Sequence, residues 1–179
     1  MIIATKALGK INTKYGIYFI YGNHDKGYFN YRDFTEEDLR KELNKNNITI
    51  LEDESTLINN SFYVVGRQDK TEIDRLSAKE LVKDFDKNKY IIMLDHQPND
   101  YNNEMNNADL VLSGHTHGGQ LIPLGKIGLM IKANDKVYGL EKRGKTNFIV
   151  SSGISDWALK FKTGTFSEYV IINIKGNVK

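Results

Sequence analysis

The sequence contains no cysteine, so it can form neither disulfide bonds nor thiolate metal sites. This absence favours a reducing compartment, and any bound metal must be held by nitrogen and oxygen atoms. No apolar run approaches the about 20 residues that span a bilayer, and the N-terminus lacks the charged and then apolar layout of a signal peptide. We therefore expect a cytoplasmic protein as the sequence is given; an anchor or signal upstream would change that expectation.

The chain is also poor in proline and in net charge. Its two prolines, 40% hydrophobic residues and 27% charged residues are typical of a globular protein rather than of a disordered or fibrous one. The net charge is +2, and basic and acidic residues are interleaved, so there is no basic stripe of the kind that binds nucleic acid. Nucleic acid is therefore not predicted as a stable partner. The length of 179 residues is that of one domain, and we interpret residues 1–179 as a single domain.

Short apolar runs alternate with amphipathic segments, which is the pattern of an α/β fold. Three near-continuous apolar runs are expected to form central parallel strands, at residues 15–22, 89–95 and 108–114. Residues 35–46 and 77–88 are predicted to be helices, because Thr35 and Ser77 are good N-caps and apolar residues follow at helical spacing.

Other segments favour β-structure. Residues 55–66 suggest a hairpin that turns at Asn59 and Asn60. Three later β-rich runs, with no clear helix between them, predict a second and mostly antiparallel sheet after the parallel one. These runs are residues 136–141, 146–153 and 167–175.

At the N-terminus, Ile3, Ala7 and Ile11 recur every fourth residue ahead of Gly16. This spacing predicts a helix that ends near Gly16, a good residue for the position after a helix. Thr5 could instead cap a shorter helix.

All four histidines of the chain follow directly after predicted strands. His24 follows the first strand, His96 the second, and His115 and His117 the third. Open parallel sheets place their binding sites at the carboxyl ends of strands, so these loops should meet at one edge. A turn is the alternative explanation for any single case, because Asn, Asp and Gly favour loops. It does not explain why all four histidines lie at equivalent strand ends.

The stretch GHTHGG, at residues 114–119, places two imidazoles in a glycine-lined turn. Imidazole and amide oxygen suit divalent metals such as Mn, Fe and Zn. A pair of ions about 3.5 to 4 Å apart could take one histidine each. The histidine-triad nucleotide hydrolases are a rival interpretation, but their third alternating histidine would fall at Gly119.

GNHD at residues 22–25, His96 in LDHQP, and GHTHGGQ at residues 114–120 resemble the last three motifs of the calcineurin-like metallophosphoesterases in order and spacing. The C-terminal stretch at residues 151–174 further resembles the end of a bacterial phosphoesterase subgroup, so the likeness covers nearly the whole chain. The resemblance implies an α/β/β/α layered fold, in which a β-sandwich is flanked by helices.

The resemblance also implies a role for each motif residue. Asn23, His96 and His115 would hold one metal ion, and His117 would contribute to a second. His24 would lie beside the leaving group as a general acid or charge stabiliser, oriented by Asp25. The metals would be Mn, Fe or Zn, and the substrate a phosphomonoester or phosphodiester attacked by a hydroxide that bridges the two ions. A membrane surface would be a partner only through a phospholipid-like substrate.

The first two family motifs, an Asp-x-His and a Gly-Asp pair, do not occur in the sequence. We therefore expect a C-terminal portion of such an enzyme, without its N-terminal strands and with one or fewer metal ions. Two hypotheses follow. The chain is a metal-dependent phosphoester hydrolase, or it is a remnant that binds at most one metal ion and is either catalytically inactive or active only with a complementing N-terminal fragment. Nucleic-acid binding without catalysis is a distant third.

Two expectations about the site can be checked directly. Asn23, His96 and His115 should lie within about 5 Å of one another if they hold one ion. Metal uptake should fall as the pH drops through about 6.5, the ordinary histidine pKa.

Five other residues invite a simpler explanation. Trp157 is interpreted as a packing residue, and Tyr28 and Phe29 could line a leaving-group pocket. Arg67 and Asp69 could approach the site, although a turn explains them nearly as well.

Overall fold

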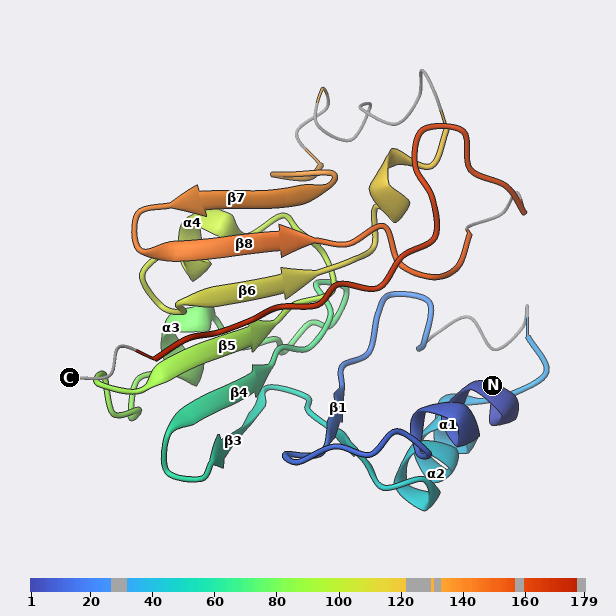
Figure 1. Ribbon diagram of the computed structural model, residues 1–179, viewed down its shortest axis with the longest axis horizontal. Helices are drawn as coiled ribbons and strands as arrows, with labels where there is room; N and C mark the ends of the chain where they lie inside the picture. Colours follow the sequence, from blue (N-terminus) through green and yellow to red (C-terminus); the bar gives the residue numbers. More distant parts are fainter. Residues whose placement is uncertain (27–31, 122–129, 131–132, 157–159, 177–179) are drawn as a thin grey trace.

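A mixed six-stranded sheet is the largest element of the computed structural model, which describes residues 1–26, 32–121, 130, 133–156 and 160–176 (Figure 1). Its strand order is β3-β4-β5-β6-β8-β7. The four inner strands run parallel, and the two edge strands are antiparallel to their neighbours. The strands are β3 (Glu54–Ile58), β4 (Phe62–Gly66), β5 (Tyr90–Leu94), β6 (Leu110–Ser113), β7 (Gly139–Arg143) and β8 (Thr146–Val150).

A second, two-stranded parallel sheet is formed by β1 (Ile17–Phe19) and β2 (Ile48–Ile50). The connection between them is right for a parallel pair, because it contains a helix, α2 (Glu36–Lys45). The short helix α1 (Ile2–Leu8) lies beside α2 in Figure 1.

Side chains of β1 and of the residues after it point alternately to its two sides, and so they contact both α2 and the large sheet. On one side, Tyr21 packs with Leu39 and Leu43 of α2 and with Ile48 of β2. On the other side, Tyr18 and Ile20 pack against a cluster of the large sheet that contains Val64 and Leu94. The small sheet therefore lies between α2 and the large sheet.

The opposite face of the large sheet is covered by two one-turn helices, α3 (Ala78–Leu81) and α4 (Tyr101–Glu104). Alternate sheet residues on this face form the main core with Ala78 and Tyr101, and the Tyr101 ring stacks on Phe148 with centroids 3.8 Å apart. The buried sheet residues of this core are Val65, Met93, Val111, Phe148 and Val150. The order of layers is α/β/β/α, as the resemblance noted in the sequence implies.

Both predicted helix starts are confirmed as capping boxes. The Thr35 hydroxyl accepts from the Asp38 N–H while the Asp38 carboxylate accepts from the Thr35 N–H, and Ser77 and Glu80 repeat the arrangement in α3. The prediction of a helix over 77–88 was wrong in length, because α3 ends at Leu81. Beyond it, the Asp86 side chain accepts from the Asn88 N–H, and this local bond competes with helix continuation.

The hairpin is confirmed, and three residues connect the paired Ile58 and Phe62. The Ser61 N–H donates to the Ile58 carbonyl at 2.8 Å, and the two central residues of this turn, Asn59 and Asn60, are both at positive φ. Two strand assignments were wrong. The run at 15–22 forms β1 of the small sheet rather than a central strand of the large one. The later β-rich runs do not form a separate antiparallel sheet either, because β8 pairs in parallel with β6 and carries β7 at its outer edge.

The N-terminal helix is also shorter than predicted, because α1 ends at Leu8. Gly9 lies against the end of α2, and a Cβ at Gly9 would be 2.8 Å from the Asn46 carbonyl oxygen. The residues that recur every fourth position do not form a buried face, since Ile3 and Ile11 are exposed. Thr5 does not cap a shorter helix, because it lies inside α1 and its hydroxyl donates to the Ile2 carbonyl.

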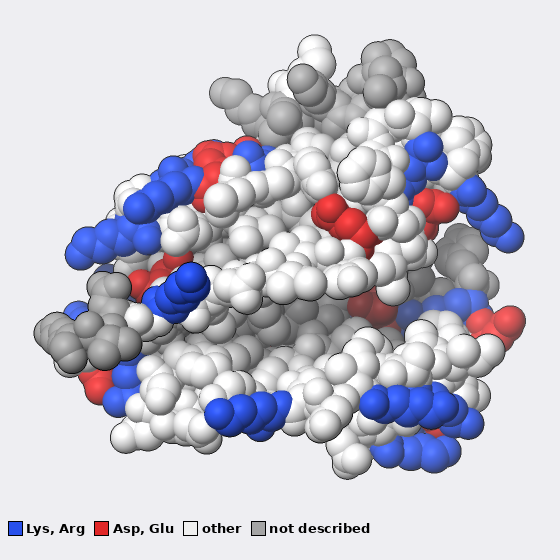
Figure 2. Space-filling model, viewed as in Figure 1, with Lys and Arg blue, Asp and Glu red and all other residues white. Residues whose placement is uncertain are grey.

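The third β-rich run, residues 167–175, is extended but is not part of either sheet as the structure describes it. In Figure 1 it crosses in front of β5 on the side away from α3 and α4. Tyr169, Val170 and Ile171 are exposed, and Ile92, Leu112 and Ile149 on this face of the sheet are only half-buried. Figure 2 shows that Lys and Arg lie toward the margins of this side and that its hollowed middle is mostly uncharged.

No helix among the described residues is both long enough and apolar enough to cross a membrane.

Candidate metal centre

The loop after β1 is closed by two hydrogen bonds. The Gly22 N–H donates to Asp25 Oδ2 at 2.7 Å, and the Asp25 N–H donates to the Gly22 carbonyl at 2.9 Å. Asn23 and His24 are therefore held at the apex of a tight turn, with the His24 side chain exposed.

The loops after β5 and β6 are joined through their backbones. The Asp95 N–H donates to the Leu112 carbonyl at 3.0 Å, and the Gly114 N–H donates to the His96 carbonyl at 3.1 Å. These bonds extend the parallel pairing of the two strands and place His96 and His115 next to each other, with their ring centroids 5.1 Å apart.

Four of the six residues in the GHTHGG turn are at positive φ, namely His115, His117, Gly118 and Gly119. Non-glycine residues rarely adopt this conformation, which marks the turn as constrained. Thr116 lies between the two histidines and its hydroxyl donates to the Val137 carbonyl at 2.6 Å. The two imidazoles have different neighbours, because His115 Nδ1 faces Asn23 and His96 whereas His117 Nδ1 faces the Ser155 carbonyl.

Three side-chain atoms converge where these loops meet. His96 Nε2 lies 3.1 Å from Asn23 Oδ1, and His115 Nδ1 lies 3.2 Å from each of those two atoms. The expected spacing within about 5 Å is confirmed. Atoms that bind one divalent ion at about 2.0 to 2.2 Å are about 3.0 to 3.4 Å apart, so the triangle has the dimensions of three ligands of one ion.

His117 does not join this triangle. Its Nδ1 lies 3.1 Å from the Ser155 carbonyl, to which it donates in the tautomer that leaves Nε2 unprotonated. Both His117 and His24 are close enough to lower the pKa values of His96 and His115. Among the described residues, no group of three His, Cys, Asp or Glu side chains is arranged to hold a metal, so the triangle depends on the Asn23 amide.

Burial keeps the imidazoles of the triangle neutral. Burial, reinforced by the neighbouring His115, lowers the pKa of His96 to about 4. Burial also lowers the pKa of His115. Neutral imidazole is the form that binds metal, so both rings are ready to act as ligands at neutral pH.

A sequence model of the calcineurin-like phosphoesterase family matches residues 3–119, which include all of these loops. The chain belongs to this family.

Among the relatives of this metallophosphoesterase chain are three uncharacterized bacterial metallophosphoesterases. The protein from Campylobacter jejuni is 35% identical over 94% of this chain and 45% of its own length. The protein from Aquifex aeolicus is 31% identical over 94% of this chain and 64% of its own length, and one from Helicobacter pylori is 30% identical over 93% and 45%. The chain thus spans about half to two thirds of the length of these relatives. No solved structure gives a significant match.

The structure adds residues to the metallophosphoesterase site that the sequence did not identify. Arg32 donates to the carbonyls of His24 at 2.8 Å and Asp25 at 2.6 Å, and so holds the first loop from outside. Gln97 donates to both carboxylate oxygens of Asp69 at 2.9 and 3.0 Å. Arg32 lies outside the three motifs, and Gln97 lies within LDHQP next to His96. The sequence pattern indicates the contacts of neither residue, so only the folded arrangement identifies them.

Asp69 is a buried charge beside the triangle rather than a simple turn residue. Although burial opposes ionisation, hydrogen bonds from Thr71 and Gln97 lower the pKa of Asp69, and its charge acts on His96 and His115. Asp25 differs, because burial raises its pKa despite the hydrogen bond from Gly22. Trp157, Tyr28 and Phe29 lie outside the described residues, so the proposals for them stay predictions.

Gly22→Ala should weaken metal binding about tenfold or more. An added Cβ would lie 2.7 to 2.9 Å from three atoms of the His96 ring and would push the ring out of the triangle. Calorimetric titration with Mn²⁺ would measure the change, with circular dichroism to verify folding. Gly114→Ala is a matched control, because its added Cβ would meet nothing within 4 Å. Equal affinity of the Gly22→Ala and unmodified chains would argue against the triangle as the metal site.

Proposed function

We propose that this chain carries the histidine-bearing part of a metal-dependent phosphoester hydrolase. The observation that supports the proposal most directly is the triangle of Asn23, His96 and His115 in a member of the calcineurin-like phosphoesterase family. Two neutral imidazoles and an amide oxygen fit Mn, Fe or Zn. When bound, such an ion supplies Lewis-acid polarisation of a phosphoryl group.

The position of each motif residue supports a role for it in the proposed site. Asn23, His96 and His115 hold one ion, and His117, turned away from the triangle, contributes Nε2 to a second position. His24 is exposed at the apex of its loop, where it can donate a proton to the departing alcohol. Asp25 orients His24 through the backbone of the loop, because its carboxylate closes the turn on Gly22.

A second candidate function is that of an inactive or split remnant. The sequence contains neither an Asp-x-His nor a Gly-Asp pair, and the triangle has no carboxylate ligand. Divalent ions in proteins commonly have three or four protein ligands, so the chain alone should bind at most one ion, with micromolar or weaker affinity.

The same ligand count suggests a partner, namely a polypeptide segment that supplies both missing motifs. The half-buried face of the large sheet and the exposed apolar residues at 169–171 offer it a surface for β-pairing and burial. We infer that an N-terminal metallophosphoesterase fragment binds there.

The substrate class follows from the family alone, as a phosphomonoester or phosphodiester. A membrane surface would be contacted through a phospholipid-like substrate only. Nucleic acid is not proposed as a stable partner, because the chain carries little net charge.

One experiment tests both candidate functions. Metal content, Mn²⁺ affinity and hydrolysis of chromogenic phosphomonoesters and phosphodiesters would be measured for this chain alone, for the chain mixed with such a fragment, and for an extended chain with both motifs. At most one weakly held ion and very little turnover are expected for the chain alone, and two ions with turnover for the others.

His96→Ala is the control, and it should abolish both metal binding and turnover in every form. Two tightly bound ions and ordinary turnover from the chain alone would refute the remnant hypothesis. No metal uptake by any form would refute the proposed hydrolase.

A further inference from the structure

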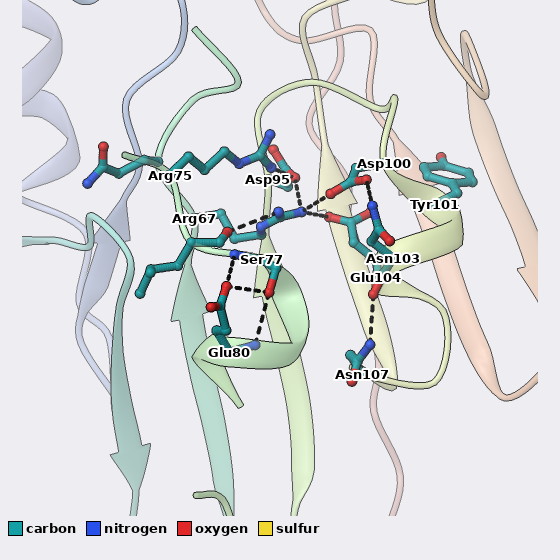
Figure 3. A network of polar contacts seen from close by, with 12 residues as sticks. Arg67, Arg75, Ser77, Glu80, Asp95, Asp100, Tyr101, Asn103, Glu104 and Asn107 are labelled. Carbon is teal, nitrogen blue, oxygen red and sulfur yellow. Dashed lines mark hydrogen bonds and ion pairs between the residues drawn. The ribbon is translucent and has the colours of Figure 1, made fainter. Parts of the chain in front are cut away.

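A buried cluster of ionic side chains includes Asp95, the residue directly before His96 (Figure 3). Arg67 follows β4 and is 2% exposed, while Asp95 and Glu104 are 0% and 1% exposed. Buried charges are costly unless they are paired, so this cluster calls for an explanation beyond the general stability of the fold.

One guanidinium nitrogen of Arg67 contacts three carboxyl groups. Arg67 Nη1 lies 2.9 Å from Asp95 Oδ2, 2.9 Å from Asp100 Oδ2 and 3.1 Å from Glu104 Oε1. Its other nitrogen, Nη2, donates to the Leu76 carbonyl at 3.2 Å. Arg75 forms a second ion pair with Asp95, so Asp95 is held by two cations (Figure 3).

The charges of the cluster balance if one carboxyl group keeps its proton. Two arginines, Arg67 and Arg75, face the three carboxyl groups. Burial, together with the negative charge of Asp95, raises the pKa of Glu104 well above its usual range. Movement of Arg67 or Asp95 would leave a buried charge unpaired, so the cluster resists rearrangement.

The cluster holds both ends of the loop from Asp95 to Asp100. Asp95 immediately precedes His96, and Asp100 immediately precedes α4. The backbone is held as well, because the Arg67 N–H donates to the Leu94 carbonyl at 3.0 Å. The loop therefore has little freedom to carry His96 Nε2 away from Asn23 and His115.

We propose that Arg67 is a positioning residue that, by clamping Asp95 and Asp100, fixes the His96 ring at the metal triangle. This inference rests on the proposed metal-binding role of His96. It explains why the arginine is buried among acids at this strand end, where an apolar residue would be less costly.

The test compares Arg67→Met and Arg67→Lys with the unmodified chain, using Co²⁺ as the probe. Arg67→Met should raise the dissociation constant for Co²⁺ at least tenfold and alter the visible absorption bands, which report ligand geometry. Arg67→Lys keeps the charge but not the fork, and should fall between the two. Ile58→Ala is the control, because Ile58 is buried at the opposite end of the hairpin. It should lower the unfolding midpoint while leaving the Co²⁺ affinity and spectrum unchanged.

A second readout requires no metal. In the unmodified chain, the His96 ring packs against Gly22, so nuclear Overhauser contacts between the His96 ring and the Gly22 α protons are expected. They should be lost in Arg67→Met and in Arg75→Met, which removes the other clamp on Asp95 and serves if the first variant does not fold.

The two readouts separate the possible failures. Loss of these contacts without Co²⁺ binding by the unmodified chain would refute the metal site but retain the positioning role. Unchanged contacts in the folded variants, with unchanged Co²⁺ affinity where Co²⁺ binds, would overturn the inference.

Discussion

In an extended chain with a complete metal site, His24→Ala is expected to lower kcat by about 10² to 10⁴ while the metal content stays unchanged. The reason is positional. His24 is exposed at the apex of the loop closed by Gly22 and Asp25, whereas the triangle is formed by Asn23, His96 and His115. A proton donor at the edge of a site affects the departure of the leaving group rather than the retention of the ion.

Steady-state assays of kcat, with substrates that differ in their leaving groups, would measure this effect. The loss should be greatest for poor leaving groups, which need the proton most, and smallest for p-nitrophenolate. His117→Ala is the contrasting variant, because it should reduce the number of bound ions. If His24→Ala also released metal, His24 would have to be reassigned as a ligand.

The second large effect concerns acid. The free energy of unfolding of the metal-free chain should fall by on the order of 3 kcal/mol between pH 6.5 and pH 4, through His96 alone. In this range the unfolded chain binds a proton at His96 and the folded chain, with its pKa of about 4, does not. Unfolding is therefore favoured as the pH falls, and the lowered pKa of His115 acts in the same direction.

Urea denaturation at a series of pH values would measure the slope, and His96→Gln should remove most of it. The difference between the two proteins isolates His96 from carboxyl groups that titrate nearby. An equal slope in both would mean that His96 is protonated in the folded chain. The lowered pKa values also shift the expected pH dependence of metal uptake, since proton competition should begin well below pH 6.5 at His96 and at a lower pH than usual at His115.

Local signals in the sequence were sufficient for features that depend on neighbouring residues. The capping boxes at Thr35 and Ser77 and the hairpin turn at Asn59 and Asn60 each rest on bonds or backbone angles within four residues. The meeting of His96 and His115 was also predictable, because β5 and β6 are parallel neighbours whose carboxyl ends lie at one edge. Asn23 joins them for a reason that the rule does not contain, because β1 belongs to the small sheet.

Long-range choices were not predictable in this way. A β-rich run such as 146–153 has the same composition whether it pairs in parallel or antiparallel, so the sequence could not place β8 beside β6. The role of Arg67 was hidden for a similar reason, because its carboxylate partners Asp95 and Glu104 are 28 and 37 residues away. Pairings at such distances are set by the packing of the whole fold.

The triangle draws Asn23 from the loop after the small sheet and its two imidazoles from loops after the large one. An ion bound at this point would consequently link the small sheet to the large sheet, which are in apolar contact around Tyr18 and Ile20. By mass action, bound metal favours the docked arrangement by RT ln(1 + [M]/Kd), with the ion concentration [M] and its dissociation constant Kd. If the proposed metal binds here, its supply and withdrawal would therefore act on the cohesion of the two sheets, as well as on any chemistry where their loops meet.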